Sequence, residues 1–437
     1  MHIELNATHD PHRKSWVDSA NVANGDFPIQ NLPFGLFHEA GRTRCGVALG
    51  DQIIDLASMH QAGILSGGGR DAVAAASGET LAPLLAMSPY AVSALRMALS
   101  NLFRADGAQD RDRLASCLVP MRSAQMLLPL RPTAFTDFCT SIDHIRRLVG
   151  TAPLAAMSLP IGYNGRVSSV RASGTAVVRP CGQFQTSPGS DDIHFGPEPS
   201  LDFEAELGVW LRTGNRLGEP WPVARAGEAM FGCCLVNDWS ARAIQQFESM
   251  LGPYLSKSFL TSVSPWIVTM EALAPFRVAA RGRDKGEPAI MPHLLDLSDR
   301  AGGALNIEVT ADLSTAHGGR IQITRTNTRH LFWTLAQMIA HQASNGAPLE
   351  SGDLVASGTL SGPADDSRAC LAEFPLQAGR RIILSDGSGR SMLEDGDTVI
   401  LRGRAIAEGF VSIGFGHCEG TIHPAPACGD ARSAPAS

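Results

Sequence analysis

Three carboxylates alternate with apolar residues in the stretch PSLDFEAELGVWL, which covers residues 199–211. This alternation predicts a β-strand with one apolar face, and it places Asp202, Glu204 and Glu206 on the other face, about 6.6 Å from one to the next. No Lys or Arg lies within the stretch to neutralise them. From the strand alone two interpretations stay open: water screens the repulsion on an exposed face, or a bound cation cancels it.

A second acidic position belongs to a segment with helical spacing. In FGCCLVNDWSARAIQQFESM, the residues Asp238, Arg242, Gln245 and Ser249 recur at intervals of four, three and four, which predicts one stripe on a helix. The stripe is either a solvent-exposed Asp–Arg pair of little energetic weight, or a carboxylate, a cation and an amide that face one pocket.

Other polar residues lie in apolar surroundings, where burial without a partner is costly. Asp137 precedes Phe138, His144 follows seven residues after Asp137, and Lys257 and Glu373 interrupt further apolar runs. Zinc sites use closely spaced Cys and His, and the chain has no such cluster, whereas carboxylate and carbonyl oxygens suit Ca²⁺ or Mg²⁺, with Mn²⁺ as a further option. The set favours an oxygen-coordinated divalent cation.

The elements that must position these residues are short strands, turns and a few helices. The Gly-Asp pair at 50–51 predicts a tight hairpin, residues 70–118 have helical spacing, and helices are predicted near 222–249 and 329–344. In LVASGTLSGP, residues 354–363, an apolar strand ends in a turn of small residues, which lets a substrate approach the backbone.

The length of 437 residues allows two or more domains. Three prolines between 119 and 135 indicate a connector. We therefore expect an N-terminal domain over 1–125 and a catalytic domain over 126–423, followed by a disordered tail rich in Pro, Ala and Ser over 424–437.

Composition narrows the classes of partner. The net charge is −7 and no basic cluster occurs, which argues against nucleic acid and acidic membrane surfaces as partners. We find no signal-peptide pattern and no apolar run of membrane length. The nine cysteines are scattered without a CxxC motif, so reduced thiols in a cytoplasmic protein are the expectation.

Taken in order, several motifs resemble the fumarylacetoacetate hydrolase family over nearly the whole chain. The most specific are LPIGYNGRVSSV, GNRLGEP, NDWSAR, KSF, SVSPW and ASGTLSGP. The resemblance implies a mainly β fold with some α, in which a small N-terminal SH3-like barrel precedes a mixed β-sandwich roll, and it implies a homodimer. It also implies metal-dependent hydrolysis of a carbon–carbon bond in a 1,3-diketo acid, 4-fumarylacetoacetate, to fumarate and acetoacetate during tyrosine and phenylalanine breakdown.

The metal site that the resemblance implies would explain the acidic strand. Asp202 would then be a bystander near the strand end. The implied ligands are Asp137, Glu204, Glu206 and Asp238, with Lys257 and Thr261 beside them and Thr261 near a second, structural Mg²⁺.

The resemblance also implies the catalytic and substrate-binding residues. His144 is the implied general base, paired with Glu373, and Arg242, Gln245 and Lys257 are the implied oxyanion stabilisers. The implied substrate contacts are Cys139, Tyr163, Gln245, Ser249 and Thr359.

The chain departs from the family at the substrate end of the site. Cys139 and Ser249 replace two tyrosines, and the loop after His144 is shorter, so that Arg146 or Arg147 would have to replace a carboxylate-binding Arg. A wider and less polar pocket is expected. One alternative is a family enzyme acting on a different diketone or acylpyruvate, as a hydrolase, decarboxylase, isomerase or cyclase in a specialised pathway. Another is a non-catalytic scaffold, which would have lost the base or the ligands, and none is lost.

Overall fold

A long mixed sheet forms the centre of the computed structural model of the chain, which describes residues 3–107, 110–187, 189–249, 252–374 and 381–427. Its main path is β4-β3-β2-β1-β17-β14-β13-β22-β6-β7, with β5 on β1, β16 on β14, and β8 on β16. The strands are β1 (Phe34–Glu39), β2 (Arg42–Leu49), β3 (Gln52–Asp55), β4 (Leu118–Pro120), β5 (Gln125–Leu127), β6 (Phe135–Cys139), β7 (Ile161–Asn164), β8 (Val170–Ala172), β13 (Ala205–Leu211), β14 (Met230–Asp238), β16 (Thr261–Val263), β17 (Trp266–Thr269) and β22 (Leu354–Ala356).

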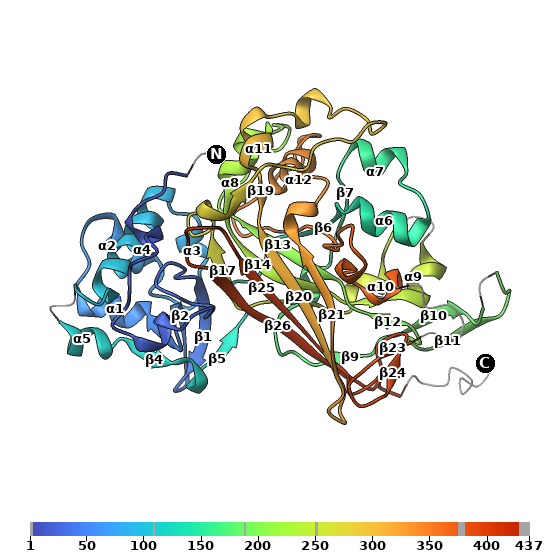
Figure 1. Cartoon of the computed structure of the whole chain (residues 1–437), viewed down its shortest axis with the longest axis horizontal. Helices are drawn as coiled ribbons and strands as arrows, with labels where there is room; N and C mark the ends of the chain where they lie inside the picture. The colour runs from blue at the N-terminus through green and yellow to red at the C-terminus, as the bar shows by residue number, and fades with distance from the viewer. Residues whose placement is uncertain (1–2, 108–109, 188, 250–251, 375–380, 428–437) are drawn as a thin grey trace, which may run out of the picture.

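A second sheet of five strands, in the order β21-β20-β25-β26-β9, crosses the middle of the molecule in Figure 1. Its strands are β9 (Val177–Val178), β20 (Ile307–Ser314), β21 (Arg320–Asn327), β25 (Thr398–Ala405) and β26 (Ile413–His423). Four two-stranded pairs complete the β structure: β10 (Cys181–Gln185) with β11 (Ile193–Pro197), β12 (Leu201–Asp202) with β15 (Ser240–Ala241), β18 (Arg277–Val278) with β19 (Ala304–Leu305), and β23 (Ile382–Ile383) with β24 (Gly389–Arg390).

Helices lie around the sheets rather than between the strands (Figure 1). In the N-terminal part they are α1 (Leu56–Ala62), α2 (Gly67–Ala75), α3 (Ala82–Leu85), α4 (Pro89–Phe103) and α5 (Arg111–Ala115). The others are α6 (Ile142–Val149), α7 (Leu154–Ser158), α8 (Val223–Ala229), α9 (Arg242–Glu248), α10 (Leu255–Ser258), α11 (Leu297–Gly302) and α12 (Leu335–Gln342). The mainly β fold with some α is confirmed.

The N-terminal strands do not close into a barrel. Strand β1 pairs with β2 and β5 and also, through Phe34 and Gly35, with β17 of the C-terminal part. The N-terminal strands therefore continue into the long sheet as one open path. The division at 125/126 stays a prediction, and of the expected tail, residues 428–437 lie outside the described residues.

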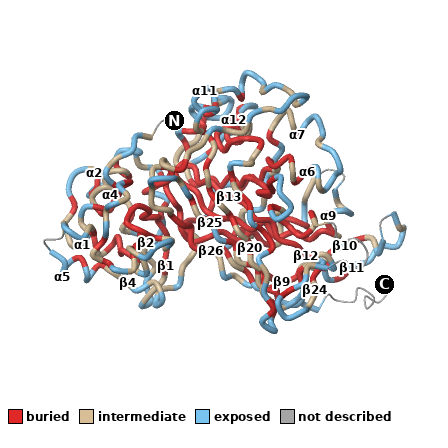
Figure 2. The backbone as a smooth tube through the Cα atoms, in the orientation of Figure 1, coloured by how far each residue is buried: buried red, intermediate tan, exposed pale blue. Residues whose placement is uncertain are grey.

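Strand β13 is buried on both faces, which excludes the interpretation that water screens the carboxylates on an exposed face. Leu207 and Val209 belong to the core of the C-terminal part, whereas Trp210 belongs to the core that the N-terminal helices share. All seven residues of β13 are buried, and the interior of the sheet is buried throughout in Figure 2. The alternating residues of this strand therefore face two different hydrophobic cores, and neither face is exposed to solvent.

The helix expected near 222–249 is wrong in its middle. Residues 223–229 form α8 and residues 242–248 form α9, but the segment between them is the fully buried central strand β14. Asp238 ends that strand, so it does not share a helical stripe with Arg242. Burial between β13, β16 and β17 favours a strand for this apolar run regardless of its polar spacing.

Three local predictions are confirmed. Gly50 has a φ of +61° in the hairpin between β2 and β3, a conformation that glycine adopts without strain. The region 70–118 holds helices α2 to α5, and α12 accounts for the helix expected near 329–344.

Two further properties concern membrane-spanning helices and the state of the cysteines. Within the described residues, no helix combines the length and apolar character needed to cross a bilayer. Among the described residues, seven cysteines are free thiols, whereas Cys181 is disulfide-bonded, so the expectation of reduced thiols is wrong for this residue.

A candidate metal and catalytic site

Strand register brings the acidic residues together across neighbouring interior strands of the long sheet. Ala356 of β22 lies opposite Asp137 of β6 on one side and Gly208 of β13 on the other. Glu206 lies two residues before Gly208 on β13, and Asp238 ends the neighbouring β14. Three adjacent parts of one sheet therefore supply three carboxylates.

Glu204 joins them from the break between β12 and β13. Its backbone N–H donates to Asn237 Oδ1 at 3.1 Å, and its carbonyl accepts from the N–H of Asp238 at 3.2 Å. Asp137, Glu204, Glu206 and Asp238 then each offer a carboxylate oxygen within 4.8 Å of the others, and all four are buried. Glu204 and Glu206 therefore converge as expected, although Glu204 lies in the interruption between the two strands.

Unpaired oxygens make this cluster a fit for a cation. While the carboxylates are ionised, no donor in the described chain reaches either oxygen of Glu206 or Oδ1 of Asp137. Burial raises the pKa of Glu206 well above its usual range, and the charges of Asp137, Asp238 and Glu204 raise it further. Burial, followed by the charge of Asp238, likewise raises the pKa of Asp137. A divalent cation with oxygen ligands would satisfy these atoms and cancel the repulsion.

Three side chains complete the surroundings of the cluster. The Tyr163 hydroxyl lies 2.7 Å from Asp238 Oδ2 and 3.0 Å from Asp137 Oδ2, and Thr261 donates to Asp238 Oδ1 at 2.9 Å. Lys257 Nζ lies 2.5 Å from Glu204 Oε2 and 3.0 Å from Asp238 Oδ2.

Lys257 balances charge in the cluster and is not a ligand while it is protonated. Burial alone would lower its pKa, but the charges of Asp238 and Glu204 outweigh burial and raise it. An ammonium has no lone pair for a cation. The role of Thr261 near a second Mg²⁺ stays a prediction.

The predicted base and its carboxylate form a buried pair beside the acidic cluster. His144, on α6, lies with Nδ1 2.7 Å from Glu373 Oε1. Glu373 is in the 3₁₀ helix Leu371–Glu373 and also accepts hydrogen bonds from Ser361 and, at 2.9 Å, from Arg147 Nη1. Burial alone would raise the pKa of Glu373, but its bonds to His144, Ser361 and Arg147 outweigh burial and lower it.

Arg242 has a fixed position between two carboxylates. Its Nε donates to Asp202 Oδ2 at 2.9 Å, and its Nη1 lies 2.8 Å from Glu204 Oε1 and 3.0 Å from Gln245 Oε1. The Nη2 atom forms an ion pair with Asp202 Oδ2 at 2.9 Å, but within the described protein it has no hydrogen-bond partner of normal geometry. Asp202 is fully buried and stands outside the cluster of four carboxylates, in agreement with its expected place outside the metal ligands, but it contacts Arg242.

One pocket of about 890 Å³ is lined by part of this set, namely Asp137, His144, Tyr163, Glu204, Arg242, Gln245 and Lys257. Cys139 and Ser249 line it too, with Thr359, and burial raises the pKa of the Cys139 thiol to about 12, which disfavours a thiolate. The pocket also exposes apolar side chains. They are Ile145, Leu148, Val149, Ile161, Pro253 and Met392.

The two candidates for a substrate-binding Arg differ in position. Arg147 lines the pocket, but besides Glu373 it donates to the carbonyls of Gly362 and Ala364, at 2.8 and 2.9 Å. Arg146 is not among the lining residues and lies 3.5 Å from Glu287. Any carboxylate-binding role of either residue stays a prediction.

Two positioning carboxylates were missed in the sequence. Glu198 accepts the N–H groups of Ala243 and Ile244 at the start of α9, which carries Arg242. Glu248 accepts the N–H groups of residues 254, 255 and 256, at the start of the short helix that carries Lys257. A carboxylate at a helix N-terminus is favoured, but a cap supplied from a distant segment leaves no local signal.

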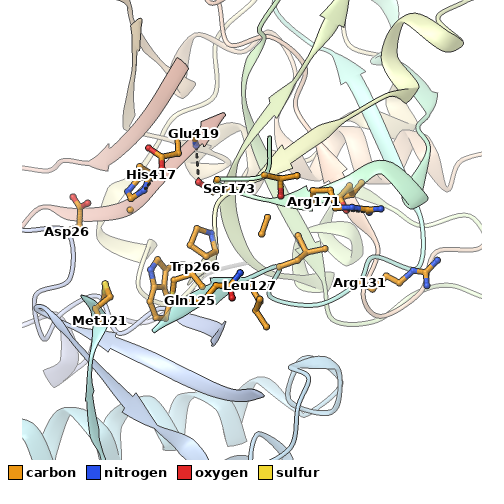
Figure 3. A pocket seen from close by; sticks show the side chains of 18 of the residues that line it. Asp26, Met121, Gln125, Leu127, Arg131, Arg171, Ser173, Trp266, His417 and Glu419 are labelled. Carbon is orange, nitrogen blue, oxygen red and sulfur yellow. Dashed lines mark hydrogen bonds and ion pairs between the residues drawn. The ribbon is translucent and has the colours of Figure 1, made fainter. Parts of the chain in front are cut away.

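A larger cavity of about 1050 Å³ lies elsewhere, between β5, β8, Trp266 and β26. In Figure 3, Asp26 and Glu419 lie toward one end, and Arg131 and Arg171 lie toward the other. None of the predicted site residues lines it. The convergence of base, carboxylates and cations therefore distinguishes the smaller pocket as the candidate site.

Sequence profiles of two domains match the chain, "Fumarylacetoacetase N-terminal" over residues 30–129 and "Fumarylacetoacetate (FAA) hydrolase C-terminal" over residues 133–423. The chain belongs to the fumarylacetoacetate hydrolase family. It is 40% identical over 431 residues to the fumarylacetoacetase of Oryza sativa subsp. japonica, an alignment that covers 94% of this chain and 97% of the relative. It is 37% identical over 420 residues to the fumarylacetoacetase of Homo sapiens, with 92% and 97% covered.

A solved structure of the family, the fumarylacetoacetate hydrolase of Exiguobacterium antarcticum, aligns with a TM-score of 0.48 at 16% identity and covers 90% of this chain and 99% of that chain. Family membership does not depend on this likeness, because the sequence matches extend over nearly the whole chain. The resemblance in the motifs is thereby confirmed.

Proposed function

We propose that the chain hydrolyses the carbon–carbon bond of 4-fumarylacetoacetate to give fumarate and acetoacetate. The observation that carries the proposal is a cluster of four buried carboxylates beside the hydrogen-bonded His144–Glu373 pair. Asp137 and Glu204 of this cluster line one pocket together with His144 and Arg242. Relatives named fumarylacetoacetase at up to 40% identity support it.

The metal assigned to this site is Mg²⁺ or Ca²⁺, with Mn²⁺ as a further option. Asp137, Glu204, Glu206 and Asp238 would hold it, since their oxygens converge and several lack a donor. When bound, such a cation supplies positive charge that polarises a substrate carbonyl and favours departure of an enolate.

His144 activates the water molecule in this proposal. Nδ1–H donates to the Glu373 carboxylate, which leaves the lone pair of Nε2 to accept a proton from water. The water oxygen forms a bond to the carbonyl carbon of the fumaryl group, the carbon–carbon bond breaks, and its electron pair leaves with the acetoacetate part, which then takes up a proton. Removal of such a base typically costs about 10²–10⁴-fold in rate.

Arg242 stabilises the oxyanion that forms at the attacked carbonyl. Its Nη2 is buried and, apart from an ion pair with Asp202, has no hydrogen bond, while Glu204 and Gln245 hold Nη1 and Asp202 holds Nε. A donor held in place before the reaction needs no reorganisation as charge develops. Lys257 and Gln245 line the same pocket and are assigned the same role.

A second candidate function is favoured by the apolar residues and the paired cations that line the pocket. Its lining residues include the three cations Arg147, Arg242 and Lys257, and each already contacts a carboxylate. The apolar lining residues suit an uncharged or bulkier acyl group, so the alternative is a different diketone or an acylpyruvate as substrate.

A substrate panel decides between the two. Purified enzyme with Mg²⁺ or Ca²⁺ is assayed for kcat/KM on fumarylacetoacetate, an acylpyruvate and an aryl-substituted 1,3-diketone. The main proposal expects fumarylacetoacetate to be the best of the three. An aryl diketone preferred by more than about tenfold would replace it by the alternative.

We further propose a homodimer in the cytoplasm that acts in tyrosine and phenylalanine breakdown on a small diketo acid, without nucleic acid or membrane as a partner. The relatives' names support the substrate, and the net charge of −7 argues against nucleic acid as a partner. Light scattering after size exclusion should give twice the chain mass of 46.3 kDa. A monomer at micromolar concentration would contradict the dimer.

A further inference from the structure

Asp202 contacts two different arms of the candidate site. On one side its Oδ2 accepts the hydrogen bond from Arg242 Nε at 2.9 Å. On the other side the N–H of Leu371 donates to Oδ1 at 2.8 Å and the N–H of Ala372 donates to Oδ2 at 3.0 Å. Its side chain is fully buried. One carboxylate thus joins three segments that are far apart in the sequence.

The first arm is the guanidinium of Arg242. Arg242 is the first residue of α9, and β12 pairs with β15 just before it, with Asp202 opposite Ser240. A guanidinium bound at Nε by one carboxylate and at Nη1 by another, Glu204, has little rotational freedom left. Without Asp202, the long side chain would be fixed at one end only.

The second arm is the short helix that presents Glu373. Its first two backbone N–H groups, those of Leu371 and Ala372, have no partner within a helix of three residues. Asp202 accepts both, so its carboxylate sets the position of the helix start. Glu373, the next residue, orients His144.

We propose that Asp202 is a positioning residue that fixes the position of the oxyanion-binding Arg242 relative to the base-orienting Glu373. It touches neither substrate nor cation. The inference rests on the proposed function, since the roles of Arg242 and Glu373 belong to it. Displacement of catalytic groups by about 1 Å costs on the order of 10²-fold in rate, and loss of supporting contacts costs about 10–100-fold.

The structure offers a matched control in Asp55. This buried carboxylate also accepts two backbone N–H groups at a helix start, from Ala57 and Ser58, and pairs with one arginine, Arg44. It lies in the N-terminal part, at α1, and does not line the candidate pocket. Asp55→Asn therefore removes the same kind of contact without touching the site.

The experiment compares Asp202→Asn in three backgrounds: wild type, Arg242→Met and Glu373→Gln. In wild type we expect kcat to fall about 10–100-fold while the dissociation constant for Mg²⁺, measured by calorimetry, stays within about threefold. In each of the other two backgrounds the added loss should shrink at least threefold, because the arm through which Asp202 acts is already gone. Asp55→Asn should leave kcat unchanged.

An equal loss from Asp202→Asn in all three backgrounds would overturn the proposal, since a purely structural role gives independent effects. A loss that shrinks in only one background would overturn the link between the two arms. If Asp202→Asn does not fold, Asp202→Glu, which keeps the charge but moves the carboxylate by one methylene, is used in the same three backgrounds.

A second readout needs no turnover. The proton shared by His144 Nδ1 and Glu373 should give a downfield NMR signal that shifts or broadens in Asp202→Asn and is unchanged in Asp55→Asn. An unaltered signal in Asp202→Asn would overturn the role of Asp202. Because this readout is independent of substrate, a wild-type chain that does not hydrolyse fumarylacetoacetate would count against the proposed function alone.

Discussion

Glu206→Gln should have opposite effects on the stability of the metal-free and the metal-loaded enzyme. In the metal-free protein, Glu206 is a buried carboxyl whose oxygens have no donor in the described chain. The amide removes one of several like charges that repel each other there, so the metal-free variant should be more stable than wild type. With a cation present, the same change removes one of four anionic ligands and should be destabilising.

The size of the metal-dependent effect follows from linkage. A cation at 100 times its Kd stabilises the folded enzyme by about 2.7 kcal/mol. Because supporting contacts alone are worth about 10–100-fold in affinity, we take about 100-fold for the loss of a charged ligand. The remaining stabilisation is then about 0.4 kcal/mol by the same relation. For 437 residues, with an unfolding entropy of about 2.1 cal/mol/K per residue, the difference corresponds to about 2–3 °C in Tm.

The effect of pH on the metal-free enzyme has a definite sign. Burial and the neighbouring carboxylates raise the pKa of Glu206 in the folded state. A group with a raised folded pKa stabilises the fold below its unfolded pKa of about 4.3, and this stabilisation is lost as the pH rises through the folded pKa. Glu206→Gln should therefore lose less stability than wild type when metal-free protein is taken upward from about pH 5.

The assay is thermal unfolding with EDTA and with added Mg²⁺ or Ca²⁺, for wild type, Glu206→Gln and the exposed control Glu79→Gln. We expect the cation to raise the Tm of wild type and of the control and to have little effect on Glu206→Gln. Equal cation-dependent shifts in wild type and Glu206→Gln would refute the assignment of Glu206 as a ligand.

Two further changes test the base and the pocket. His144→Ala should keep cation binding by calorimetry and lose about 10²–10⁴-fold in kcat, and a near wild-type rate would mean that water is activated without His144. The pair Cys139→Tyr and Ser249→Tyr, which adds two phenols to the pocket, should raise the kcat/KM ratio of fumarylacetoacetate over an uncharged diketone, and an unchanged ratio would show that these positions do not set specificity.

The sequence predicted most of the candidate site because its residue types are unusual for where they stand. A carboxylate in an apolar run, such as Asp137 or Glu206, costs free energy unless a partner exists, so each one is a signal that can be seen locally. The structure brings them together as expected. The hairpin at Gly50 could be predicted equally well from the sequence, since its turn depends on neighbouring residues only.

Other features depend on contacts that the local sequence does not record. Asp202 looked like a polar residue on an exposed strand face because alternation cannot say that β12, which contains it, is buried as β13 is. Asp238 looked helical because spacing was counted across a strand-to-helix junction, and burial between two neighbouring strands decided the matter. Glu198 caps α9 from 45 residues away, and only the folded chain shows such a partner.

The most direct test of the account titrates metal-stripped enzyme with Mg²⁺ or Ca²⁺ and follows cation binding and fumarylacetoacetate hydrolysis in the same sample. We predict that hydrolysis is absent with EDTA, that it returns with the same midpoint as cation binding, and that fumarate and acetoacetate appear in equal amounts. Glu206→Gln should shift both midpoints together to higher cation concentration. Full hydrolysis in EDTA, or a return of activity in Glu206→Gln at the wild-type midpoint, would contradict the metal-dependent site described by Asp137, Glu204, Glu206 and Asp238.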